Sequence, residues 1–135
     1  MAAPAVPEFL YGTAWKEDRT AALTEQALRA GFRGIDTANQ RRHYVEAGVG
    51  EALAAASRAG SVTRADVFLQ TKFTYRGGQD HRLPYDPAAP VATQVAQSMA
   101  SSLEPSAPTT WTATCCTGPR RGRAGARPTS KPGRP

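Results

Sequence analysis

The chain of 135 residues is long enough for one small domain, and its 40% hydrophobic and 21% charged residues are ordinary for a globular protein. Its formal net charge of +6 suggests a negatively charged partner such as a nucleic acid or a membrane surface. The position of the charge argues against both, because residues 1–104 hold 11 Lys and Arg and 11 Asp and Glu, whereas residues 105–135 hold 6 Lys and Arg and no acid.

The first predicted elements are a strand and a helix. Residues 8–15 are apolar and aromatic and include Gly12 and Thr13 near their end, which is typical of a buried strand running into a tight loop. Asp18 is a candidate N-cap of the helix, in which Ala and Leu recur at spacings of three and four until Gly31 ends it.

The alternation of strand and helix then continues. The further predicted elements are a strand at 32–36, a helix at 46–59 ended by Gly60, a strand at 67–72, a loop rich in Gly, Pro and Asp at 75–90, and a helix at 91–103.

Strands that alternate with helices of this length imply right-handed crossovers and a parallel sheet, in either a barrel or a doubly wound layer. In both architectures, ligands and catalytic groups gather at the C-terminal ends of the strands. The polar residues at these ends, Thr13, Asp36 and Lys72, are therefore the first candidates for a functional role.

Beyond Glu104 the sequence changes to Pro, Thr, Arg and Gly without a helical or strand period. Such a composition cannot bury enough apolar area to offset the entropy of ordering, so we expect residues 105–135 to form a disordered basic tail. Cys115 and Cys116 are adjacent in this tail, a spacing that suits neither a zinc knuckle nor a disulfide framework. We expect no metal site.

The N-terminus lacks a basic region followed by an apolar stretch, and no run of about 18 apolar residues is present. We therefore expect a cytoplasmic location and no membrane partner. No GxGxxG follows a predicted strand, so a Rossmann cofactor site is not expected either.

Four phrases, taken in their order and spacing, resemble the aldo/keto reductase family. They are GTAW at 12–15, GFRGIDTA at 31–38, HYVEAGVGEAL at 43–53 and VFLQTK at 67–72. The family pattern is a Gly-Thr turn, a strand with Ile-Asp-Thr-Ala, a Tyr followed by a Glu and a Val-Gly, and a strand ending in Thr-Lys. The resemblance covers roughly residues 8–104. One departure is the distance from Asp36 to Tyr44, which is longer than in most members of the family because residues 39–42 extend the connection.

The resemblance implies an α/β fold, an incomplete TIM (β/α)8 barrel of about three βα units within residues 1–104. It also implies an NADP(H)-dependent oxidoreductase that reduces a small aldehyde or ketone to an alcohol. A phenol is a poor acid at neutral pH, and a nearby ammonium stabilises its ionised form. By the resemblance, Tyr44 donates the proton, Lys72 supplies the ammonium, and Asp36 holds Lys72 in place.

The resemblance also assigns residues to the cofactor and the substrate. The backbone around Gly12, Thr13 and Ala14, together with Asp36, would lie near the nicotinamide, and Trp15 would form a wall of the substrate pocket. Taken singly, each of these residue types has a plainer reading: an Asp after a strand often caps a turn, a Tyr packs, and a Lys is solvated. The four phrases together favour the catalytic assignment.

The family next has a fourth strand that ends in a His, and this sequence has no such pattern. Residues 106–119 read SAPTTWTATCCTGP. Regrouping their codons one nucleotide earlier permits LGTDYLDSYVLHGP, which resembles the family's fourth strand with its His. We infer an insertion or deletion near Pro105 that puts residues 105–135 off frame. A barrel without its later units would have unpaired strand edges and weak or absent cofactor binding, so we expect the chain as written to be inactive.

Two other functions remain open. The basic tail, with Arg at 120, 121, 123 and 127, could bind RNA or an acidic partner in a salt-dependent way. Its lack of aromatic residues between the charges argues against nucleic acid. A barrel without turnover could instead act as a nucleotide-sensing or regulatory subunit.

Overall fold

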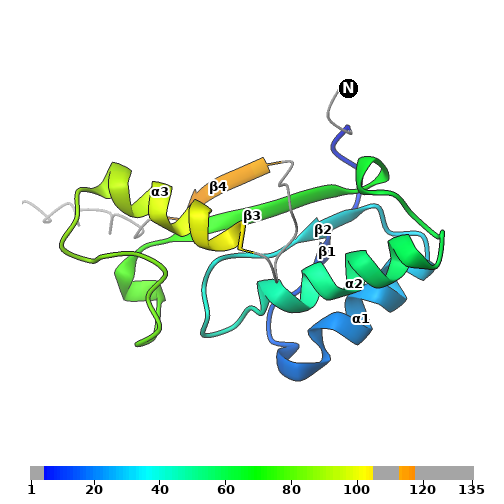
Figure 1. Ribbon diagram of the computed structural model, residues 1–135, viewed down its shortest axis with the longest axis horizontal. Helices are drawn as coiled ribbons and strands as arrows, with labels where there is room; N and C mark the ends of the chain where they lie inside the picture. Colours follow the sequence, from blue (N-terminus) through cyan, green and yellow to red (C-terminus); the bar gives the residue numbers. More distant parts are fainter. Residues whose placement is uncertain (1–4, 105–112, 118–135) are drawn as a thin grey trace, which may run out of the picture.

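The computed structural model describes residues 5–104 and the backbone of residues 113–117 (Figure 1). Its strands are β1 (Tyr11–Gly12), β2 (Gly34–Asp36), β3 (Phe68–Thr74) and β4 (Ala113–Thr117). Its helices are α1 (Thr20–Arg29), α2 (Glu46–Arg58) and α3 (Val91–Ser102). Short 3-10 turns are η1 (Glu17–Arg19), η2 (Arg64–Asp66) and η3 (Arg76–Gly78).

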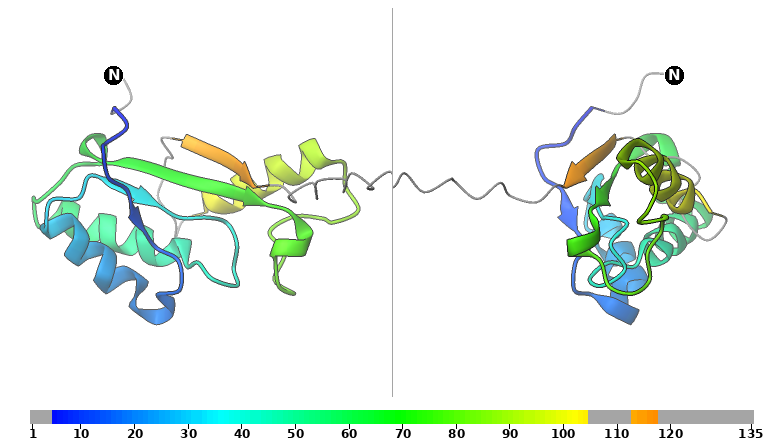
Figure 2. Two further views of the ribbon diagram at one scale, coloured as in Figure 1. Left: turned by 180° about the vertical axis from the view of Figure 1, so that it is seen from behind. Right: turned by 90° about the vertical axis from the view of Figure 1, so that its left-hand side faces the viewer.

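The four strands form one sheet in the order β1-β2-β3-β4, and every neighbouring pair is parallel. The described helices all lie on one face of this sheet (Figure 2). A doubly wound sheet reverses its strand order and carries helices on both faces, whereas the strands of a barrel follow one another in chain order. The described residues therefore match the opening part of a barrel.

The core lies between the sheet and the first two helices. Ile35 on β2 and Leu69 on β3 are fully buried, as are Leu28 on α1 and Val49 on α2. Burying an aliphatic side chain of this size contributes about 1.5–3 kcal/mol, so this layer holds the sheet and helices together. The buried cluster consists of Leu28, Ile35, Val49, Leu53, Ala56, Val62, Val67 and Leu69.

The predicted helix ends are confirmed at two glycines, and one predicted helix start is wrong. Gly31 and Gly60 follow α1 and α2 with φ of 105° and 74°, the left-handed conformation that favours glycine after a helix. Asp18 does not cap α1, because the 3-10 turn η1 contains it and α1 begins at Thr20 without a side-chain cap. The Thr20 hydroxyl instead donates to the carbonyl of Glu17 at 2.7 Å.

The strands differ in length from the prediction. Only Tyr11 and Gly12 of the expected first strand pair with β2. The segment before them crosses Gly34 closely, since a Cβ there would lie 2.4 Å from the Leu10 side chain and 2.5 Å from that of Pro7. In contrast, β3 continues beyond Lys72 to Thr74, so that Lys72 lies inside the strand.

The fourth strand is the largest departure from expectation. β4 pairs in parallel with β3 from Gln70↔Ala113 to Thr74↔Thr117, inside the tail that was expected to be disordered. For these five residues the expectation was wrong, because their strand conformation comes from hydrogen bonds to the free edge of β3. Local composition carries no information about a pairing partner that is distant in sequence. Residues 105–112 and 118–135 of that tail lie outside the described residues. No helix in the described part of the chain is long and apolar enough to cross a membrane.

Candidate active site

The three residues assigned to catalysis come from neighbouring segments. Asp36 is the last residue of β2, Lys72 lies in β3, and Tyr44 lies in the connection between β2 and α2. The register pairs Asp36 with Gln70, and Lys72 follows two residues later. Since side chains two apart in a strand share a face, Gln70 and Lys72 point to the same side of the sheet.

Asp36 and Lys72 form a partly buried ion pair. Lys72 Nζ donates to Asp36 Oδ1 at 2.5 Å and to the backbone carbonyl of Thr37 at 3.0 Å. The side chain of Lys72 is only 17% exposed, and that of Asp36 only 22%. Such a pair is screened by solvent less than a surface pair, and removing one partner leaves the other charge poorly compensated.

Tyr44 completes the group. Its ring centroid lies 5.7 Å from Lys72 Nζ, within the range of a cation–π contact. The ammonium therefore lies over the phenol ring, and the structure brings Asp36, Tyr44 and Lys72 together at the C-terminal ends of β2 and β3.

The residues assigned to the cofactor lie at the end of β1. Thr13 is fully buried, and its backbone N–H and its hydroxyl both donate to the Asp36 carbonyl at 3.0 Å. Thr13 thereby fixes the end of β1 to the end of β2. A Cβ on Gly12 would meet nothing within 4 Å, so the backbone there borders open space. Ala14 is partly buried, and its carbonyl accepts a hydrogen bond from Lys16 Nζ at 3.4 Å.

Trp15 is exposed and stacks on His43. Its side chain is 67% exposed, and its ring centroid lies 3.5 Å from that of His43. The backbone N–H of Trp15 donates to the backbone carbonyl of His43 at 2.8 Å. Trp15 has φ of 62°, a left-handed conformation that costs a non-glycine residue about 1–3 kcal/mol. The loop before Tyr44 and the turn after β1 are thus held together.

Two further residues of the site depend on tertiary contacts and were missed in the sequence. Gln70 Nε2 donates to Asp36 Oδ1 at 2.7 Å, the same oxygen that accepts from Lys72. Glu46, the first residue of α2, accepts hydrogen bonds from the hydroxyls of Thr71 and, at 2.9 Å, Ser102. The alternation of side chains along β3 was the available signal for Gln70, and the first Glu in the phrase HYVEAGVGEAL was the available signal for Glu46.

The carboxyl of Glu46 is partly buried, and this burial raises its pKa above the ordinary value. The hydrogen bonds from Thr71 and Ser102 and the charge of Arg41 oppose this shift. A carboxylate is costly to desolvate unless it is well hydrogen-bonded, which explains both directions.

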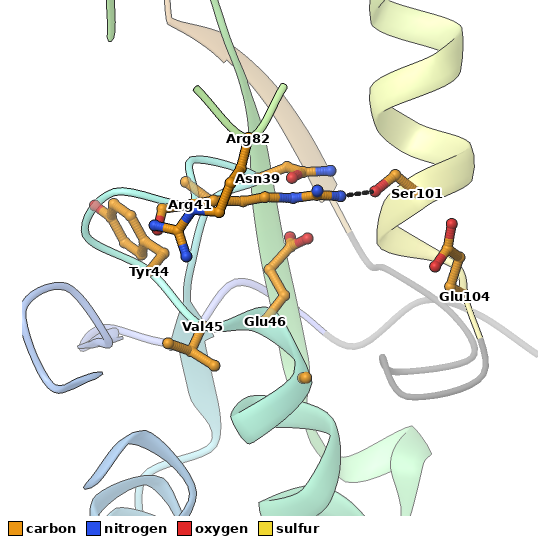
Figure 3. Close-up of a pocket in the computed structure, with 10 residues that line it drawn as sticks. Asn39, Arg41, Tyr44, Val45, Glu46, Arg82, Ser101 and Glu104 are labelled. Carbon is orange, nitrogen blue, oxygen red and sulfur yellow. Dashed lines mark hydrogen bonds between the residues drawn. The ribbon is translucent and has the colours of Figure 1, made fainter. Parts of the chain in front are cut away.

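A pocket of about 240 Å³ lies beside Tyr44, between the start of α2 and the end of α3. Figure 3 shows Arg41 reaching across it to the hydroxyl of Ser101, at 3.0 Å. Glu46 and Arg82 also line it, whereas Asp36 and Lys72 do not. The pocket therefore lies between Tyr44 and the helices α2 and α3, and it does not include the ion pair of Asp36 and Lys72. Among the side chains that the structure describes, no group of three His, Cys, Asp or Glu could hold a metal ion.

The class of protein follows from the fold and the site together. A parallel sheet in chain order, with helices on one face and a charged pair beside a tyrosine near the C-terminal strand ends, matches the opening βα units of a parallel α/β barrel.

Comparisons with known proteins lead to a particular family. No family profile and no curated protein matches the sequence. An aldo-keto reductase complexed with NADPH matches with a TM-score of 0.55 and 24% identity, over 73% of this chain and 28% of that chain. A Bombyx mori aldo-keto reductase in complex with NADP matches with a TM-score of 0.55 and 25% identity, over 73% of this chain and 30% of that one.

The aldose reductase from Schistosoma japonicum is also similar, with a TM-score of 0.55 and 24% identity over 75% of this chain and 29% of that chain. The described residues thus have the fold of a part of these enzymes. The likeness supports a relationship of the N-terminal part with the aldo-keto reductase family. The chain spans less than a third of the length of each of these three structures.

Proposed function

We propose that this chain is the N-terminal part of an NADPH-dependent aldo/keto reductase, an oxidoreductase that reduces a small aldehyde or ketone to an alcohol. The observation that carries the proposal is the ion pair of Asp36 and Lys72 beside the ring of Tyr44. The NADPH and NADP complexes among the similar structures support this choice of cofactor.

The residues at the end of the sheet fit a nicotinamide group. The open space at Gly12 lets a flat ring approach the backbone. Among the described residues, Asp36 Oδ2 accepts no hydrogen bond, so this oxygen is available to a hydroxyl donor. Gly12, Thr13, Ala14 and Asp36 would hold the nicotinamide end, which supplies a hydride to the carbonyl carbon when bound.

The chain's own residues then handle the proton. Tyr44 donates the proton of its Oη to the carbonyl oxygen as negative charge develops there. The ammonium of Lys72 stabilises the phenolate that remains, and Asp36 and the Thr37 carbonyl hold that ammonium beside the ring. The exposed ring of Trp15 forms one wall for the substrate.

We also propose that the chain is read off frame after about residue 104 and has no turnover as written. Residues 105–135 contain no His, whereas the family's fourth strand ends in one that orients the carbonyl. Sequencing the DNA across codon 105 tests this part of the proposal. We expect a continuous reading frame one base away that encodes the fourth strand; a shifted frame that soon reaches a stop codon would contradict it.

Activity is tested in the frame-restored protein by following NADPH oxidation with a panel of aldehydes. We expect Tyr44→Phe to lower kcat by about 10²- to 10⁴-fold, the usual contribution of a general acid. Tyr75→Phe is the matched control, because Tyr75 lies after β3 and outside the group around Lys72. A nucleotide-sensing barrel would instead give the same background rate with and without Tyr44→Phe.

A further inference from the structure

Two side chains of β3 donate to one oxygen of Asp36. Lys72 Nζ lies 2.5 Å from Oδ1, and Gln70 Nε2 lies 2.7 Å from the same atom. The β2–β3 register places Gln70 directly opposite Asp36, so this contact follows from the pairing of the two strands. Within the described part of the chain, the second oxygen of Asp36 accepts no hydrogen bond.

The shared oxygen has an electrostatic consequence. A hydrogen bond from an amide withdraws part of the negative charge that Oδ1 presents to the ammonium. The pair of Asp36 and Lys72 is therefore weaker than it would be if Lys72 were the only donor. A less neutralised ammonium exerts a stronger field on its other neighbour, the ring of Tyr44, 5.7 Å away.

We propose that Gln70 is a positioning residue that limits the hold of Asp36 on Lys72 and so increases the effect of the ammonium on Tyr44. Its role in catalysis rests on the proposed function, whereas the effect on Lys72 does not. Gln70 is partly buried and is not expected to touch the substrate, so it acts only through Asp36.

The effect on Lys72 is measurable in the 135-residue chain itself. Competitive acetylation with limiting acetic anhydride, read by mass spectrometry, reports how readily each amine reacts, and Lys16 serves as the internal reference. Asp36→Asn establishes the range, because losing the carboxylate should increase the acetylation of Lys72.

We expect Gln70→Leu to slow the acetylation of Lys72 relative to Lys16 by about two- to fourfold, since the ammonium is held more strongly. Gln70→Glu should slow it further, because a second carboxylate then faces Lys72. Gln26→Leu on the exposed side of α1 is the matched control and should change nothing. Circular dichroism checks that each variant folds, and Gln70→Met replaces Gln70→Leu if the latter does not.

An unchanged or faster acetylation of Lys72 in a folded variant that lacks the Gln70 amide would overturn the inference. The catalytic consequence is measured separately in the frame-restored protein. We expect Gln70→Leu to lower kcat by about two- to fourfold with KM for the aldehyde unchanged, as befits a residue that acts through another. If the acetylation responds but the frame-restored protein reduces no carbonyl, the proposed function fails and the effect of Gln70 on Lys72 stands.

Discussion

Asp36 accepts hydrogen bonds from the segments on both sides of β2 within the site. Its backbone carbonyl accepts from Thr13 twice, and its side chain accepts from Gln70 and Lys72. Without the carboxylate, the ammonium of Lys72 would keep the Thr37 carbonyl and the ring of Tyr44 as its partners among the described residues. The contribution of this ion pair to the free energy of unfolding should therefore depend on both residues.

A double-mutant cycle tests this dependence. We expect Asp36→Ala to lower the free energy of unfolding by about 1–3 kcal/mol, because it leaves a poorly solvated ammonium. Lys72→Met in the same background should recover part of the loss. Urea unfolding of the two single variants and the double variant gives the coupling energy. Strict additivity would mean that the pair contributes nothing to stability.

The partly buried carboxyl of Glu46 should make the stability of the chain depend on pH. Burial raises its folded-state pKa above the ordinary value of 4.5, so the folded chain holds this proton more tightly than the unfolded chain does. The resulting stabilisation is fully present below the unfolded pKa and is lost as pH rises through the raised folded value. Its window therefore begins near the ordinary glutamate value and extends above it.

We expect Glu46→Gln to remove this part of the pH dependence, so that the variant loses less stability than the parent chain as pH rises above about 4.5. Thermal unfolding over a pH series measures the difference. Glu51→Gln, on the exposed side of the same helix, is the control and should keep the parent profile. Parallel profiles for Glu46→Gln and the parent chain would contradict the prediction.

At the scale of elements, α1 and α2 approach each other closely at Gly48. A Cβ there would lie 3.0 Å from the Cβ of Thr20 and 3.1 Å from the backbone N of Ala21. Thr20 is buried and hydrogen-bonded at the start of α1, so neither neighbour can easily move. The packing of the two helices therefore requires a residue without a side chain.

Gly48→Ala should lower the free energy of unfolding by about 1 kcal/mol, because the clash exceeds the gain in helix propensity. Ala54→Gly on the exposed side of α2 is the companion variant and should also destabilise, by about 1 kcal/mol, through propensity alone. Chemical denaturation compares the two. A stabilised Gly48→Ala chain would show that the helices can move apart at no cost.

The elements also show what sequence reasoning can reach. The helices predicted at 46–59 and 91–103 match α2 and α3 to within a residue at each end. In α2, the buried residues Val49, Ala52, Leu53 and Ala56 recur at the spacing of one helix face. Asp18 failed as an N-cap because a 3-10 turn intervenes. β4 was missed because strand pairing with β3 depends on a neighbour distant in sequence.

The residues of the site likewise divide into those that the sequence predicted and those that it did not. Asp36 and Lys72 were candidates because strand ends in a parallel sheet converge, and the structure brings them together. The contribution of Gln70 depends on the register of two strands, and that of Glu46 on the packing of α2 and α3. Neither can be derived from local spacing.

At the scale of the whole molecule, β3 is one of the two inner strands of the described sheet, and it is longer than the other, β2. It pairs with β2 on one side and with β4 on the other, whereas β1 and β4 each pair with one described neighbour (Figure 1). An inner strand can open only when its neighbours separate, so the amides of β3 should be better protected than those of an edge strand such as β4.

Hydrogen exchange of the 135-residue chain tests this order. We expect the amides of β3 to exchange at least about tenfold more slowly than those of β4, a difference of about 1.4 kcal/mol in opening free energy. Mass spectrometry of overlapping peptides resolves the two strands. Equal rates in β3 and β4 would mean that the sheet opens as one unit.

The double use of Asp36 couples chemistry to folding. Its backbone oxygen is occupied only when β1 has reached β2, and its carboxylate only when β3 has aligned with β2 in the correct register. A chain whose strands are misaligned by one residue would turn Lys72 to the opposite side of the sheet. Such a misfolded chain would therefore lack the ammonium beside Tyr44, and the proposed catalytic group would form only in correctly folded molecules.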